Sequence, residues 1–154
     1  MSLDVNLEFE CTEPVYASEQ IFIREGGSTK AITREEWDRR FPDREPIVVP
    51  ATLKESDRTR NVYWANITHN LNAMASEAGI YKHLWRPDEI GIDKAKELIQ
   101  PLTDGLAALN TNPERFKKFN PSNGWGTYEG LVEFVKEYLC ACIRYPEARV
   151  SVSR

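Results

Sequence analysis

Hydrophobic and polar residues alternate at the start of the chain. Val5, Leu7, Phe9 and Cys11 are separated by polar side chains, which is the period-two pattern of a strand with one buried face. Shorter segments rich in strand-forming residues follow. They predict strands at 20–24 (closed by Gly26-Gly27), at 47–49 as an edge strand between two prolines, at 62–67 and around Val150 and Val152.

Three apolar stripes at helical spacing occupy the second half of the chain. They consist of Leu71, Met74, Ala75 and Ala78; of Ala95, Leu98, Ile99, Leu102, Leu106 and Leu109; and of Tyr128, Leu131, Val132, Val135, Tyr138, Leu139 and Cys142. We expect Thr68 to cap the first helix and Gly79 to end it. Pro101 is expected to kink or split the second, and the third should end near Pro146.

Two shorter features lie between the early strands. Thr33 is followed three residues later by Glu36, a capping box that predicts a short helix through Trp37 to Arg40. The most polar stretch, 52–60, is expected to be a solvated connection, with a mobile lid as the less favoured alternative.

The order of these elements predicts an α+β fold. Strands come early and helices late, so we expect a small antiparallel or mixed sheet with about three main helices packed on one face. The length of 154 residues suits a single domain over 1–154. Its strand-rich part is about 1–67, its helix-rich part about 68–146, and a C-terminal strand is expected at about 148–153.

Composition and charge exclude several classes of protein. The chain is 41% hydrophobic with a formal net charge of −4, which argues against disordered and collagen-like chains and against generic nucleic-acid binding. No apolar run approaches the ~20 residues of a membrane helix. The first residues lack the basic and apolar regions of a signal peptide, so we expect a cytoplasmic location and no membrane association.

The cysteines give no sign of a metal site or a disulfide framework. Cys11, Cys140 and Cys142 are odd in number, and Cys-x-Cys is not a zinc spacing. We expect Cys142 in the core and Cys140 partly buried. His69, His83 and Glu77 could in principle share a metal, but they form no spacing motif, so no metal and no cofactor is predicted.

The first candidate site is the strand-to-helix junction Asn66-Ile67-Thr68-His69-Asn70. Hydrogen-bonding side chains are concentrated where a helix begins and its backbone N–H groups lack partners. Asn66, Thr68 and Asn70 are candidate ligand-binding residues, and His69 is a candidate general acid or base. The alternative is that these side chains serve only as helix caps.

The second candidate site is the segment Asn120 to Tyr128. Two glycines flank Trp125, so the backbone can approach a ligand or a neighbouring segment closely. Asn123, Trp125 and Tyr128 are candidate ligand contacts, with Trp125 and Tyr128 as a stacking wall. The alternative is a rigid turn with Trp125 packed as a plug. A third aromatic and basic segment, 81–87, is better interpreted as a linker that wraps the core with Trp85 buried.

Several of these segments resemble a family of small uncharacterised proteins from bacteria and their phages. The resemblance covers about 61–154 and rests on Asn66 to Leu71, Ala78 to Tyr81, Leu84 to Pro87, Leu98-Ile99 with Gly105-Leu106, and Asn120 to Tyr128. The Asn-Gly-Trp-Gly segment is its most specific part. The family has no assigned activity, so the resemblance implies no catalytic residue. It does imply a cytoplasmic bacterial or phage setting.

Three functions remain open from the sequence. The first is a binding or interaction module with a pocket between 66–70 and 123–128 for a small polar or nucleotide-like ligand, or for a protein partner. The second is a small hydrolase or transferase with His69 as general base. The third is a structural protein, and a homo-oligomer is possible in each case.

Overall fold

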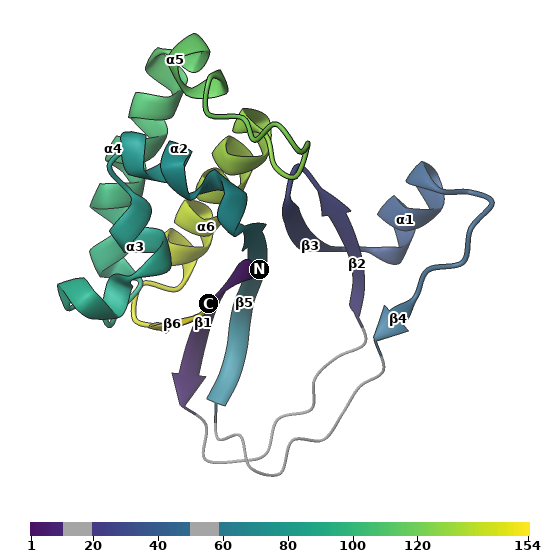
Figure 1. Ribbon diagram of the computed structural model, residues 1–154. Coiled ribbons are helices and arrows are strands. Elements are labelled where there is room, and N and C mark those ends of the chain that lie inside the picture. Colours follow the sequence, from purple (N-terminus) through teal and green to yellow (C-terminus); the bar gives the residue numbers. More distant parts are fainter. Residues whose placement is uncertain (11–19, 50–58) are drawn as a thin grey trace.

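The computed structural model describes residues 1–10, 20–49 and 59–154 (Figure 1). Within them, six strands form one sheet in the order β4-β2-β3-β5-β1-β6, and every pairing is antiparallel. The strands are β1 (Ser2–Glu10), β2 (Gln20–Glu25), β3 (Ser28–Ile32), β4 (Val48–Val49), β5 (Thr59–Thr68) and β6 (Arg149–Ser153). The helices are α1 (Arg34–Arg40), α2 (Asn72–Glu77), α3 (Tyr81–Trp85), α4 (Lys96–Thr111), α5 (Pro113–Lys117) and α6 (Tyr128–Arg144), with 3₁₀ turns η1 (His69–Leu71) and η2 (Pro87–Ile90). The α+β prediction is confirmed.

β1 is a central strand of the sheet. It pairs with β5 on one side and β6 on the other. Leu3, Val5 and Leu7 are fully buried on one face, as the alternation predicts. Cys11 and residues 50–58, which include most of the predicted polar connection, lie outside the described residues.

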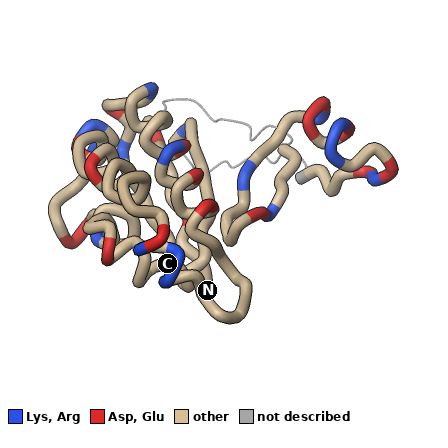
Figure 2. Tube along the Cα trace, turned by 90° about the horizontal axis from the view of Figure 1, so that it is seen from above, with Lys and Arg blue, Asp and Glu red and all other residues tan. Residues whose placement is uncertain are grey.

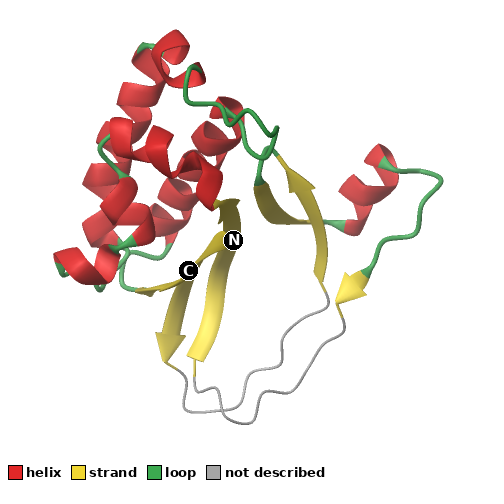
Figure 3. Cartoon of the chain, in the orientation of Figure 1, coloured by secondary structure: helices red, strands yellow, loops and turns green. Residues whose placement is uncertain are grey.

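Helix α6 packs against β5, and α4 packs in turn against α6, on the helical side of the sheet (Figure 3). Leu102 of α4 and Leu131 of α6 are completely buried in one shared core, because the apolar stripe of each amphipathic helix has to pack on another apolar surface. α4 is one helix that continues through Pro101, so the proline does not split it. No helix in the described parts of the chain is long and apolar enough to cross a membrane.

Sequence reasoning missed β3. Gly26-Gly27 was expected to close the strand at 20–24, and it instead forms the turn of a hairpin, with φ of 61° and 87°. β3 follows at once and pairs with β2 along its length. It joins β5 through only two residue pairs, Ser28 with Ile67 and Thr29 with Asn66.

Residues 20–49 therefore form a separate part of the structure, which we call the arm. It contains β2, β3, α1 and β4 and stands apart from the remaining described residues, which we call the body (Figure 1). The predicted capping box is present, because the Thr33 side chain accepts a hydrogen bond from the Glu36 N–H. α1 has no buried residue, and acidic and basic residues both lie along it (Figure 2). β4 is an edge strand, as predicted.

The two cysteines of α6 differ in their surroundings. Cys142 is fully buried, as predicted, and burial raises its pKa to about 12. Cys140 is exposed, so the expectation that it is partly buried was wrong. Residues two apart on a helix point about 200° apart around the axis, which places Cys140 on the solvent side.

Candidate functional site

The first candidate segment lies where β5 runs into η1. The Thr68 Oγ1 atom accepts a hydrogen bond from the Asn70 N–H at 3.3 Å, so the predicted cap exists, although the helix begins with a 3₁₀ turn. The Thr68 N–H donates to the Gly27 carbonyl of the arm at 2.8 Å. The junction is therefore fixed to the β2–β3 turn as well as to its own helix.

The second candidate segment is an ordered turn before α6. The Asn123 Oδ1 atom accepts a hydrogen bond from the Trp125 N–H at 3.0 Å. Thr127 caps α6 by accepting from the Gly130 N–H at 3.0 Å. This is the turn that the Asn-Gly pair predicts. The Trp125 side chain is 57% exposed, so it is not a buried plug.

The two segments meet. The Asn70 Nδ2 group donates a hydrogen bond to the Trp125 carbonyl at 3.3 Å. Gly126, at φ +117°, brings the loop so close that a Cβ atom there would lie 2.9 Å from the Leu71 side chain and 3.0 Å from that of Thr68. Only glycine fits this position, because both the backbone angle and the space exclude a side chain.

The arm supplies a third segment to the same place. A Cβ atom on Gly27 would lie 2.7 Å from the Gly126 Cα atom and 2.8 Å from the Thr68 side chain, so the hairpin turn packs directly on the loop. This contact brings Arg24 of β2 to the loop. Its guanidinium carbon lies 5.3 Å from the centroid of the Trp125 ring, within the range of a cation–π contact.

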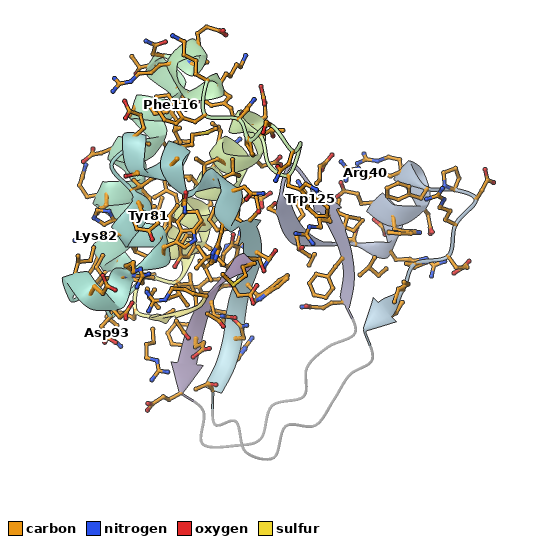
Figure 4. The ribbon with its side chains drawn as sticks, viewed as in Figure 1. Arg40, Tyr81, Lys82, Asp93, Phe116 and Trp125 are labelled. Carbon is orange, nitrogen blue, oxygen red and sulfur yellow. The ribbon has the colours of Figure 1, made fainter. Side chains whose placement is uncertain are left out.

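An open pocket of about 430 Å³ lies where these three segments meet. Its lining residues are Met1, Ser2, Arg24, Thr68, Asn70, Asn123 and Trp125. Figure 4 shows Trp125 in the loop beside the β2–β3 hairpin. Four of the predicted contact residues are therefore brought together, and Arg24, Met1 and Ser2 were missed. Gly26-Gly27 carried a partial signal, because a glycine pair permits close packing, but the partner segment was not evident.

Asn66 is placed in the sheet and does not line this pocket. Its Nδ2 group donates to Asp4 Oδ1 at 2.5 Å and to the Leu3 carbonyl at 3.3 Å. Its Oδ1 atom accepts from Thr29 Oγ1 at 3.5 Å. These bonds join β5 to its two neighbouring strands, so the amide satisfies buried hydrogen-bonding groups of the fold.

Tyr128 is also placed away from the pocket. Its ring is 7% exposed, and its hydroxyl donates to the Leu109 carbonyl at 2.8 Å. Its backbone N–H donates to Asn120 Oδ1 at 2.7 Å. The side chain thus links α6 to α4, and the stacking wall of the pocket consists of Trp125 alone.

His69 is the candidate catalytic residue, and it is absent from the pocket lining. Its ring lies edge-to-face against Trp85, with the centroids 6.2 Å apart. Trp85 itself is 2% exposed, which fits the predicted linker, although α3 makes that linker helical. The His69 Nε2 atom is buried, and no described residue forms a hydrogen bond with it. Among the described residues, no nucleophile is therefore hydrogen-bonded to this imidazole nitrogen.

The described residues contain no group of three or more His, Cys, Asp or Glu side chains arranged to hold a metal ion. Comparisons with protein-family models, with curated proteins and with solved structures found no match. The function therefore has to be inferred from the geometry and chemistry of the pocket.

Proposed function

We propose that this chain is a binding module whose pocket between 68–70 and 123–125 takes a small polar ligand. One observation carries the proposal. The hydrogen bond from Asn70 to the Trp125 carbonyl joins two polar segments that are 55 residues apart, and both line the same pocket. Ligand pockets typically combine an apolar or aromatic wall with a few converging polar groups.

The polar side chains of the pocket retain hydrogen-bonding capacity. Asn70 uses one donor for Trp125, and Asn123 uses its oxygen for the Trp125 N–H. No described residue donates to Asn70 Oδ1 or accepts from Asn123 Nδ2. The unused groups and the aromatic face support a ligand-binding role over a purely structural one.

The hydrolase or transferase alternative has no comparable support, because His69 lies outside the pocket lining. Turnover of a bound ligand that stops in His69→Ala would restore it. The cytoplasmic bacterial or phage setting implied by the family resemblance is kept as part of this proposal.

A thermal-shift screen of nucleotides, amino acids, sugars and sugar phosphates tests the proposal. A ligand at about 100 times its Kd should stabilise the fold by about 2.7 kcal/mol, which is a shift of several degrees at this size. Trp125→Ala should abolish the shift. Ile143→Ala is the matched control, because Ile143 on α6 is 58% exposed and Trp125 is 57% exposed.

The control should keep the full thermal shift. A compound that stabilises Trp125→Ala as strongly as the unmodified chain would contradict binding at this pocket. So would a screen in which no compound stabilises the unmodified chain.

A further inference from the structure

The charges and donors of the pocket define the chemistry of its ligand. Among the described residues that line it, Arg24 is the one charged side chain and none carries a carboxylate. Ser2, Thr68 and Asn123 can each donate a hydrogen bond from a hydroxyl or amide group. A lining in which a cation and neutral donors predominate favours a negatively charged ligand group and disfavours an amine.

Arg24 is held in a position that suits this task. Its guanidinium carbon lies 5.3 Å from the Trp125 ring centroid, so the indole holds the cation over one of its faces. A cation–π contact uses no hydrogen-bond acceptor, so the guanidinium N–H groups that point away from the ring can still donate. The planar edge of a guanidinium matches the two oxygens of a carboxylate or phosphate.

Arg24 also has no competing anion among its described neighbours. Arg40, in the same arm, pairs with Glu25 and Glu36. Arg24 makes no ion pair with any described carboxylate. A guanidinium beside a pocket, with no carboxylate partner among the described residues, retains donors for an incoming anion.

We infer that the pocket recognises an oxyanion, a carboxylate or phosphate group of a small molecule, through Arg24 held on Trp125. This inference rests on the proposed function and names the ligand class for the same pocket. Asn123 and the hydroxyls of Ser2 and Thr68 donate the remaining hydrogen bonds to the oxygen atoms. The neutral part of the ligand lies toward the exposed indole and the side chain of Met1.

The test uses pairs of probes that differ in the anionic group. Adenosine 5′-monophosphate is compared with adenosine, and phenylacetate with phenylacetamide. Binding is followed by NMR at the indole N–H of Trp125, assigned from Trp125→Phe, in protein without an N-terminal tag because Met1 and Ser2 line the pocket. The anionic member of at least one pair should bind at least tenfold more tightly than its neutral partner. Which pair responds distinguishes phosphate from carboxylate.

Arg24 variants assign the effect to one side chain. Arg24→Gln should weaken binding of the anionic probe by about 10- to 100-fold, the usual range for losing a charge-assisted hydrogen bond. Arg24→Lys keeps the charge but loses the planar edge, so it should give a smaller loss. Arg144→Gln is the control. It makes the same change in net charge at the last turn of α6, about 25 Å along the helix from the loop, and should leave binding unchanged.

The outcomes separate this inference from the proposed function. If neutral and anionic members bind equally and Trp125→Ala abolishes both, the pocket is real and the oxyanion inference is wrong. If Arg24→Gln and Arg144→Gln weaken binding equally, only net charge matters and the inference is again wrong. If no anionic probe binds, the inference is overturned, while the broader screen with neutral compounds still decides the proposed function.

Discussion

The body and the arm differ in how many buried side chains they contain. The body contains one continuous core of fully buried side chains from β1, β5, α4 and α6. In the described chain, none of the side chains in that core comes from 20–49. Parts of a protein with few buried apolar contacts open more readily than its core. We therefore expect the arm to unfold locally at a lower free energy than the body.

The pocket lies where these two parts meet. Trp125 and Asn70 belong to the body and Arg24 to the arm. The arm is held by two residue pairs between β3 and β5, by the glycine contacts, by the Phe22–Trp64 ring contact and by the Lys30–Glu133 ion pair. These contacts therefore set the position of Arg24 relative to Trp125 and Asn70.

The largest expected effect is in the core of the body. Leu102→Ala removes a fully buried side chain from α4 and should lower the free energy of unfolding by about 2–5 kcal/mol. Ile32→Ala, a partly exposed position in the arm, should cost less than about 1.5 kcal/mol because less apolar area is lost. Urea denaturation measures both. Equal losses would show that the arm and the body are not packed differently.

The next effect concerns the contact between arm and body. Gly130→Ala adds a Cβ atom that would clash with the Gly26 carbonyl oxygen, because the two atoms would lie closer than normal van der Waals contact allows. In an ordinary helix this substitution stabilises by about 0.5–1 kcal/mol, but here overpacking should destabilise by about 1–3 kcal/mol. Calorimetry gives the sign.

Gly124→Ala is the control for that clash. A Cβ atom at Gly124 has no neighbour within 4 Å, so only its φ of +73° opposes a side chain. It should cost about 1–2 kcal/mol from backbone strain and leave the arm in place. Hydrogen exchange of the β2–β3 amides should speed up in Gly130→Ala alone. A stabilised Gly130→Ala would refute the close packing of the hairpin turn on α6.

The smallest effect comes from Lys30, which connects β3 to α6. Its Nζ atom lies 3.0 Å from Glu133 Oε1. Burial lowers the pKa of Lys30, but the hydrogen bond and charge of Glu133 outweigh it, so the pKa lies above the usual 10.5. A double-mutant cycle with Lys30→Met and Glu133→Gln should give a coupling of about 0.2–1 kcal/mol.

The sign of the pH dependence follows from the raised pKa. The contribution of Lys30 is complete below pH 10.5, the unfolded value, and is lost as the pH rises through the higher folded-state pKa. The Lys96–Glu147 pair of the body, at 2.8 Å, serves as a control. Lys30→Met should accelerate exchange of the arm amides and Lys96→Met should not. Identical exchange in the two variants would show that Lys30 does not hold the arm.

The sequence predicted the body better than the arm. One face of β1 and one face of α6 are buried. This burial produces a periodic pattern of apolar residues, such as Val5 and Leu7, that is visible in the sequence. β3 was missed because none of its residues is buried, so it has no apolar face to detect. α5 was missed because its five residues are too few to show a stripe.

The candidate site was predicted in part for a related reason. Side-chain type revealed which residues are polar, but not whether their polar atoms are used inside the fold. Asn66 forms hydrogen bonds with a neighbouring strand, and Tyr128 forms one with a neighbouring helix. Asn123 and Trp125 instead line the pocket. Arg24 could not be predicted because its place depends on the packing of Gly27 against Gly126, a contact between distant segments.

An NMR titration of the ¹⁵N-labelled chain with inorganic phosphate and, separately, with acetate tests the central claim most directly. The account predicts saturable shifts of the Trp125 indole N–H and of the amides around Arg24 and Asn70 with at least one of the two anions. α4 should be unaffected, and Arg24→Gln should remove the response. Saturable shifts that spare Trp125, or no saturable shift with either anion, would contradict an oxyanion pocket between the arm and the body.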